Sequence, residues 1–241
     1  IPSFNGNANE SIAAISQRKA TDSELILYQK VGVRDGSFGN TPWVHEMPDP
    51  VSKVTWDNYL SVSMPDAKAN KWEDGDIMKV TANKVTVEIP MLIQPGQAKG
   101  TYGIALGYGR ELPETVKNDL KDLGVNVYPM AGTSANYVIA GATIEKVGSG
   151  HEFAQTQTHY SIEGRDIVRE ASLNAYKNDK KAGNNFHKPQ PISLWSSHDY
   201  SKGRHWGMAI DLNSCTGCSA CIVSCSIENN VPIVGRDEIR R

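Results

Sequence analysis

The chain has 241 residues, of which 25 are basic (Lys and Arg) and 27 acidic, so that its net charge of -2 excludes the broad basic surface of a nucleic-acid-binding protein. The length allows one large domain or two small ones, and a mean hydropathy of -0.43 is typical of a rather polar globular protein. No stretch approaches ~18 consecutive apolar residues, which predicts no transmembrane helix, so any membrane contact would come through partners.

The first fifty residues predict one helix, one strand and a long loop. Residues 1–24 form an N-terminal segment, in which 8–20 show a weak helical pattern with Ile12 and Ile15 on one face. Residues 25–33 are rich in β-forming side chains and predict a strand. Residues 35–50 are punctuated by Gly, Asn and Pro, which predicts a loop.

From residue 51 to about 150 the pattern is mostly that of short strands. The expected strands are 57–63, 77–81, 85–93, 101–109 and 137–147. A turn at Asn83-Lys84 makes the second and third of them a hairpin, and further turns are expected at Asp74-Gly75 and 95–100. A charged amphipathic helix fits 113–123. Several short strands at close spacing favour a mainly β fold, either a barrel or a sandwich.

Four stretches of this region carry a resemblance. They are 46–58 (EMPDPVSKVTWDN), 72–76 (WEDGD), 93–97 (IQPGQ) and 105–110 (ALGYGR). Together they resemble the molybdopterin-dinucleotide-binding domain of the large molybdopterin oxidoreductases, which implies a double-psi β-barrel over residues 25–150. Gly107, Gly109 and Arg110 could cradle a pterin phosphate, with 56–58 (WDN) lining that site. Two glycines are weak evidence, and we favour packing roles for them, together with a buried Trp56 and an Asx turn.

Residues 151–205 contain less regular sequence. We expect one more strand over 151–165 and a helix over 165–176, followed by a polar linker over 177–205. The histidines at 151, 159, 187 and 198 have no partner at metal-ligand spacing, and we expect surface or supporting roles for them. His205, ten residues before the first cysteine, is expected to pack beside Trp206, with a role in tuning a nearby metal centre as the alternative.

All four cysteines, Cys215, Cys218, Cys221 and Cys225, lie within eleven residues. Their C-x2-C-x2-C-x3-C spacing is that of ferredoxin cubane clusters, and the small residues between them let the backbone wrap closely. Structural zinc is the alternative, although zinc sites usually pair two C-x2-C knuckles and only one such run exists here. We therefore predict that the four cysteines ligate 4Fe-4S clusters, and we predict no catalytic residue and no other cofactor-binding residue in the chain.

The fourth cysteine has a separate expected role. In two-cluster ferredoxins the fourth cysteine of such a run ligates the other cluster. We therefore expect Cys225 to serve a different cubane from Cys215, Cys218 and Cys221.

The cysteine run also carries a second resemblance. Residues 211–232 (DLNSCTGCSACIVSCSIENNVP) resemble the first cluster run of the multi-cluster ferredoxin subunits that accompany molybdopterin oxidoreductases. Ser226 stands where simple ferredoxins usually have proline, which favours the multi-cluster class. The resemblance implies that 206–241 are the first part of a ferredoxin-like iron–sulfur domain. Because the chain begins at Ile1 and stops at Arg241 without a capping signal, we expect an internal or partial segment. Three further cysteine runs beyond Arg241 would fit the resemblance.

A molybdopterin-type barrel followed in one chain by a multi-cluster ferredoxin is an unusual order. Across 25–241 it resembles the iron–sulfur subunit of bacterial alternative complex III, a membrane-bound quinol-oxidising respiratory complex. The resemblance implies electron transfer from quinol toward cytochrome c haems or an oxidase, 4Fe-4S clusters (with 3Fe-4S as an option in the full-length protein), and loss of molybdopterin.

The same resemblance implies partners and a location. The partners would be a multihaem cytochrome c subunit, a monohaem cytochrome c, integral-membrane quinol-binding subunits and, as an option, a terminal oxidase. The location would be the periplasmic face of the bacterial inner membrane, as a peripheral subunit. The alternative is a catalytic molybdopterin-dependent oxidoreductase with an iron–sulfur outlet, although the sequence shows no acid–base pair and no nucleophile constellation.

Overall fold

The computed structural model describes residues 6–16, 21–110, 123–133, 136–159, 161–165, 167–184 and 192–241. The chain divides into two compact units. The larger unit comprises Ile1–Thr156 together with Gly217–Arg241, and the smaller unit comprises Gln157–Thr216. The last segment of the chain, with three of the four cysteines, therefore belongs to the same unit as the sheet.

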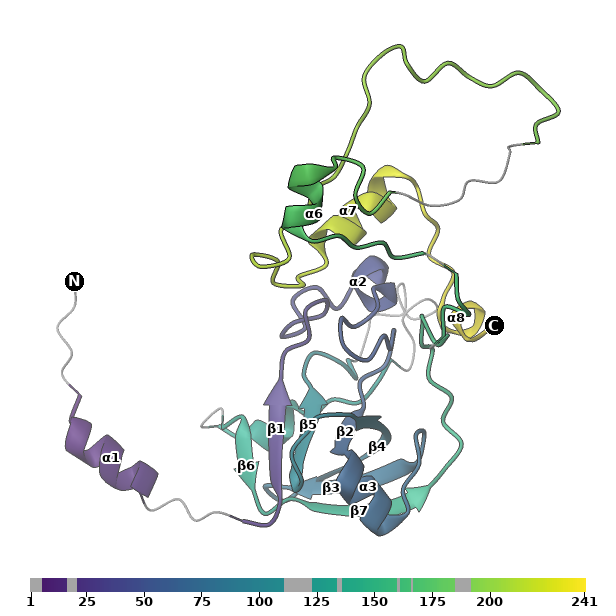
Figure 1. The fold of residues 1–241 in the computed structure, drawn as a ribbon. Coiled ribbons are helices and arrows are strands. Elements are labelled where there is room, and N and C mark those ends of the chain that lie inside the picture. Colours follow the sequence, from purple (N-terminus) through teal and green to yellow (C-terminus); the bar gives the residue numbers. More distant parts are fainter. Residues whose placement is uncertain are drawn as a thin grey trace. The chain divides into compact units, whose positions relative to one another are not determined.

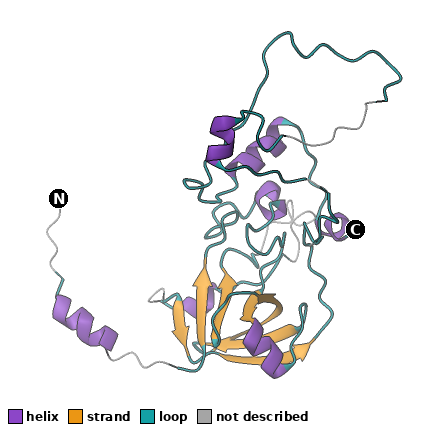
Figure 2. Ribbon diagram, in the orientation of Figure 1, coloured by secondary structure: helices purple, strands orange, loops and turns teal. Residues whose placement is uncertain are grey.

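The larger unit is built on one mixed, curled sheet of seven strands (Figures 1 and 2). The strands are β1 (Glu24–Tyr28), β2 (Leu60–Ser63), β3 (Ile77–Ala82), β4 (Val85–Gln94), β5 (Thr101–Ala105), β6 (Val138–Ala140) and β7 (Thr143–Gly148). Their order is β6-β1-β5-β2-β4-β3-β7, in which β1 pairs parallel with β5 and β2 parallel with β4, while the other pairs are antiparallel. The expected mainly β fold is confirmed.

The expected hairpin is confirmed as β3 and β4, whose residues pair from Ile77 with Pro90 to Ala82 with Val85. Its two turn residues, Asn83 and Lys84, have φ of 48° and 65°. Positive φ at both central positions is the geometry of the type I′ turn, which matches the right-handed twist of paired strands. Along β3 every second residue is buried, as expected for a strand with one face on a core.

The core lies on the inner face of this sheet. Its fully buried large side chains include Leu25, Leu60, Val62, Met78, Val80, Ile89, Met91, Ile104, Leu106 and Met130. Burial of one such side chain contributes roughly 1.5–3 kcal/mol relative to its exposure to water. The strands that supply these residues are therefore held together as one packed body.

The larger unit also contains short helices. They are α1 (Ala8–Ser16), α2 (Pro42–Glu46), α3 (Met64–Asn70), α5 (Tyr128–Ala131), α7 (Ala220–Glu228) and α8 (Arg236–Arg240). Of these, α3 packs beside β2 and β4. At α3, Ser63 accepts a hydrogen bond from the Asp66 backbone N–H and so caps the helix. In the part of the chain that the structure describes, every helix is too short or too polar to span a lipid bilayer.

Several expected strands are shorter in the structure, and the reasons lie in the backbone. The strand expected over 25–33 ends at Tyr28, because the chain turns back between Lys30 and Arg34. The strand expected over 101–109 ends at Ala105, since Gly107 and Gly109 take positive φ values of 90° and 66°.

Three further expectations change. The strand expected over 57–63 begins only at Leu60. The one expected over 137–147 is two strands, β6 and β7, separated at Gly141, which has a φ of 73°. The loop expected over 35–50 contains α2, which begins with Pro42 in its first turn. The helix expected over 113–123 lies, except for its last residue, outside the described residues.

The strand expected over 151–165 is wrong for the residues that the structure describes. Apart from one isolated bridge between Val54 and Gln155, this stretch pairs with no strand. Its backbone instead bonds to loops: the His151 N–H donates to the Gly75 carbonyl, and the Ala154 carbonyl accepts from the Thr55 N–H.

The smaller unit has one helix among its described residues, α6 (Leu173–Asn178). A helix was expected over 165–176, but it begins eight residues later because Ser172 is its N-cap, with a side chain that accepts from the Ala175 N–H. In the expected linker over 177–205, the described residues after Asn178 form neither helix nor strand.

Candidate iron–sulfur site

The four cysteines predicted to bind iron lie on and before α7. Cys215 and Cys218 precede the helix, in the smaller and the larger unit respectively. Cys221 and Cys225 lie in α7 four residues apart, which places them on the same helix face. All four side chains are exposed, and none forms a disulfide.

The loop before α7 is shaped by residues in the left-handed region. Gly217 has a φ of 69° and Ser219, at the N-cap of α7, a φ of 58°. A left-handed residue at the helix start lets the chain reverse sharply between Cys218 and Cys221. At the other end of the run, the Asn229 side-chain amide donates to the Cys225 carbonyl at 2.9 Å and to its sulfur at 3.4 Å.

The donor set suits an iron–sulfur cluster. Four exposed thiols without disulfide partners are soft ligands of the kind that iron–sulfur clusters require. Within the described ranges, no three Cys, His, Asp or Glu side chains lie close enough together to hold a metal ion. Ligation by these cysteines therefore stays a prediction, based on their type, spacing and exposure.

The Ile1–Thr156 part of the larger unit contains the sheet, and we call it the sheet domain. The chain after α7 is attached to it, and we call residues 233–241 the anchor segment. The Glu46 carboxylate, at the end of α2, accepts hydrogen bonds from the Val234 N–H at 3.1 and 3.2 Å and from the Gly235 N–H at 2.9 Å. Ile233 and Ile239 pack against the cluster of Trp56 and Ala154. Polar and apolar contacts thus hold the anchor segment against the sheet domain.

Asp57 is the buried centre of this attachment. Its carboxylate accepts from the Arg236 guanidinium at 3.1 Å and from the His151 Nε2 at 3.2 Å, while only 3% of the Asp57 side chain is exposed. Its backbone carbonyl accepts from the Lys30 Nζ at 3.1 Å. A buried carboxylate is tolerated only when it is paired in this way. His151, for which the sequence offered no partner, therefore has one.

Lys30 is a second buried charge beside Asp57. Its Nζ lies 4.4 Å from the centre of the Tyr59 ring and 5.5 Å from that of Tyr108, in cation–π geometry. Burial lowers the pKa of Lys30 to about 8, although Asp49 and Asp57 act in the opposite direction. Lys30 and Arg236 belong to no motif in the sequence, and Glu46 stands in one only as the first residue of the 46–58 stretch.

Within the larger unit, an open cavity of about 690 Å³ lies between residues 218–224 and the sheet domain. One wall comes from the turn after β1 and from α2, with Lys30, Arg34, Phe38, Val44 and Met47 among its residues. The other wall comes from Cys218, Ala220, Val223 and Ser224. One predicted iron ligand therefore opens onto a space lined by two cationic side chains.

The residues considered for a pterin phosphate contact the chain itself. A Cβ at Gly107 would meet the Gly36 nitrogen at 2.7 Å, and one at Gly109 would clash with the backbone of Asn126. The Arg110 guanidinium donates to the Gly36 carbonyl at 2.7 Å. Both glycines therefore have the packing role that we favoured, because they allow two loops to approach closely.

The expected burial of Trp56 is confirmed: the side chain is 3% exposed, and its ring stacks on His45 with centroids 5.8 Å apart. Asn58 is fully buried and acts over a longer range than an Asx turn. Its side-chain amide donates to the carbonyls of Ala105 and Val125, and its oxygen accepts from the Val125 N–H. Asn58 thus joins two loops that are distant in sequence.

Comparison with known proteins gives one short match in sequence. No protein-family model matches the chain. A stretch of 26 residues, 11% of this chain, is 65% identical to the "Menaquinone reductase, iron-sulfur cluster-binding subunit" of Nitratidesulfovibrio vulgaris and covers 10% of that subunit. The chain therefore shares a short segment with an iron–sulfur protein and matches about a tenth of its length.

The similarity to solved structures is at a low level. Acetylene hydratase from Pelobacter acetylenicus aligns with 58% of this chain at 13% sequence identity, and the alignment covers 20% of that enzyme. The TM-score is 0.30, which assigns neither a fold nor a function.

Proposed function

We propose that this chain is an electron-transfer iron–sulfur component of a quinone-linked oxidoreductase. The observation that carries the proposal is the C-x2-C-x2-C-x3-C run, whose four exposed thiols lie on α7 and the loop before it. The short match to a menaquinone reductase iron–sulfur subunit supports both the cluster and the link to quinone.

In its finer form, the proposal is the iron–sulfur subunit of an alternative complex III. The curled sheet is then a double-psi β-barrel, and the segment that begins at about residue 206 is the start of a ferredoxin-like domain. The partners are the multihaem and monohaem cytochromes c and the integral-membrane quinol-binding subunits, with a terminal oxidase as an option. Together they place the chain at the periplasmic face of the inner membrane.

The residues around the cysteines have defined tasks in this proposal. A bound cluster supplies one-electron transfer, with no bond chemistry. Cys215, Cys218 and Cys221 hold one cubane, and Cys225 reaches toward a second. Val223 is half-buried on α7 and limits the access of water to the cluster side of the helix. Water exclusion and backbone N–H groups near sulfur are general means of setting a cluster's potential.

Replacement of one thiol tests the proposal. The chain is purified without oxygen, its iron, inorganic sulfide and zinc are quantified, and its electron paramagnetic resonance spectrum is recorded after reduction with dithionite. Cys218→Ser should abolish one cluster signal and lower the iron content, because serine is a poor iron ligand in place of a thiolate. Ser224→Ala, on the same helix, is the matched control and should leave both unchanged.

Other results would overturn the proposal. Zinc in place of iron, or a Cys218→Ser spectrum and iron content equal to those of the wild type, would contradict iron–sulfur ligation. Molybdenum near one atom per chain, together with loss of turnover in Arg110→Ala without loss of assembly, would instead favour the catalytic molybdopterin enzyme.

A further inference from the structure

The wall of the 690 Å³ cavity carries cationic side chains. Two cationic side chains, Lys30 and Arg34, line it on the sheet side, and Cys218 lines it on the other side. Glu46 and Asp49 lie outside this lining, and Asp57 is turned toward Arg236 and His151. The residues that line this cavity carry two cationic side chains and no acidic one, although carboxylates outside the lining act on both cations: Asp49 and Asp57 on Lys30, and Asp35 on Arg34.

The two walls are joined by specific contacts. Beyond α7, the anchor segment is bonded to Glu46 and Asp57 and packs on Trp56. On the other side, Lys30 is buried, with its Nζ on the Asp57 carbonyl, and the Arg34 guanidinium lies 6.0 Å from the centre of the Phe38 ring. Both walls thus rest on the same few sheet-domain residues, which makes the cavity part of the folded unit.

We propose that Arg34, supported by Lys30, sets the reduction potential of the cluster held at Cys218, so that the sheet domain acts as its electrostatic cover. The proposal rests on the proposed function, because it requires a cluster at that cysteine. It assigns to the sheet domain a role in the electron-transfer step itself.

The sign of the effect follows from charge. Reduction adds one negative charge to the cluster, and a nearby fixed cation stabilises the reduced form and raises the potential. The arginine guanidinium stays protonated at any pH that the protein tolerates, so its effect does not depend on titration. A unit charge ~10 Å away shifts such an equilibrium by about tenfold at the effective dielectric of a protein, and this is an upper value here because the Arg34 side chain is exposed to solvent.

The test is a redox titration of the cluster-loaded chain, followed by electron paramagnetic resonance. Arg34→Gln should lower the midpoint potential of the cluster signal that Cys218→Ser removes. The expected change in the oxidised-to-reduced ratio is at most about tenfold, which is at most ~59 mV for a one-electron couple. Iron content is measured on every sample.

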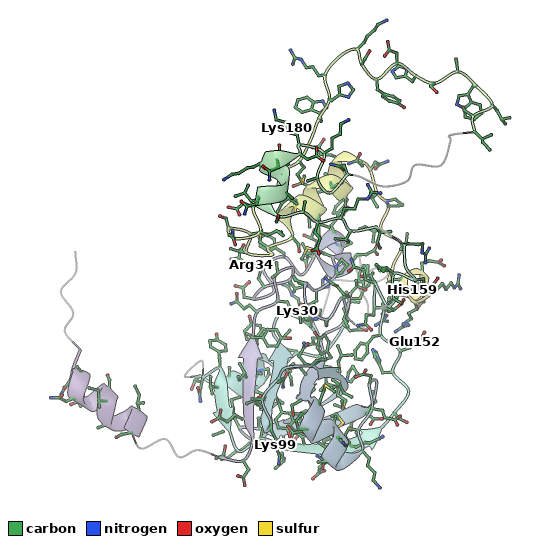
Figure 3. All side chains as sticks on the ribbon, viewed as in Figure 1. Lys30, Arg34, Lys99, Glu152, His159 and Lys180 are labelled. Carbon is green, nitrogen blue, oxygen red and sulfur yellow. The ribbon has the colours of Figure 1, made fainter. Side chains whose placement is uncertain are left out.

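Three variants serve as comparisons. Arg34→Lys keeps the charge and should stay close to the wild-type potential. Lys99→Gln removes an exposed cation at the opposite end of the sheet and should have no effect (Figure 3). Val31→Lys adds a cation to the same cavity wall at a residue that is 41% exposed, and should raise the potential even if Arg34→Gln fails to fold.

The outcomes separate the two proposals. A wild-type chain that binds no iron would refute the proposed function. Full iron content with potentials that are unchanged in both Arg34→Gln and Val31→Lys would overturn the electrostatic role of the sheet domain and leave the iron–sulfur function standing.

Discussion

His45 shows how one buried side chain makes the stability of the sheet domain depend on pH. It is 3% exposed, stacks on Trp56, and its Nε2 lies 2.8 Å from the Gly39 carbonyl. Burial lowers the pKa of His45 below its usual 6.5, and the charges of Arg110 and Lys30 act in the same direction, while the bond to Gly39 opposes them. The folded protein therefore favours the neutral ring.

This shift predicts acid sensitivity with a defined sign. Above pH 6.5 the ring is neutral in both the folded and the unfolded chain, so His45 adds no pH dependence. As the pH falls below 6.5 the unfolded chain takes up a proton that the folded chain resists, and the free energy of unfolding decreases. Urea titrations between about pH 7.5 and 5, where most carboxylates stay ionised, measure this decrease. His45→Gln should make the free energy of unfolding less dependent on pH. An equal slope in the variant would contradict the assignment.

At the scale of single elements, the start of α3 is fixed by its N-cap residue, Ser63. Ser63 is fully buried, its hydroxyl accepts from the Asp66 N–H at 3.2 Å, and it donates to the Asp66 carboxylate at 2.7 Å. That carboxylate also accepts from the Gly100 N–H at 2.7 Å. The cap of α3 thus connects the helix to the turn before β5.

Loss of this cap should be measurable. Ser63→Ala removes the hydroxyl and leaves the Asp66 N–H without its acceptor, so we expect the free energy of unfolding to fall by ~1–2 kcal/mol in urea titrations. Ser172→Ala is the matched control, because Ser172 caps α6 in the same way but is exposed. If both substitutions lower the free energy of unfolding by the same amount, the contact of Asp66 with the turn before β5 adds nothing to stability.

At the scale of the whole molecule, the larger unit is closed by contacts between distant parts of the sequence. Asp57 and Arg236 are separated by 179 residues, and Glu46 and Gly235 by 189. These contacts make the anchor segment part of the same folded body as the sheet. They also explain why the cavity beside Cys218 has a wall built from residues 29–47.

Asp57→Asn tests this closure. The variant leaves Arg236 and His151 without their carboxylate, so we expect a loss of about 2 kcal/mol in the free energy of unfolding, below the range for a fully buried pair because both partners are partly exposed. Asp237→Asn alters an exposed pair with Arg240 and should change stability by less than ~0.5 kcal/mol. Equal stability of the Asp57→Asn variant and the wild type would show that the anchor segment does not depend on this carboxylate.

The amino-acid sequence by itself determined the features that depend on neighbours within a few residues. The β3–β4 hairpin follows from alternating apolar residues and the Asn83-Lys84 turn. The prediction of iron ligands follows from the spacing of the four cysteines. Even here the ends of strands were missed at Tyr28 and Ala105, because a turn or a glycine in the left-handed region stops a strand that propensity alone would continue.

Only the tertiary structure decided which charges meet. Nothing near Asp57 in the sequence indicates Arg236 or His151, and nothing near Cys218 indicates Arg34. Such groups are brought together by the burial of the sheet's apolar face, which is specified by many residues at once and leaves no local pattern at the charged positions. A cluster site can therefore be predicted from four cysteines, whereas the charges that would surround it depend on the fold.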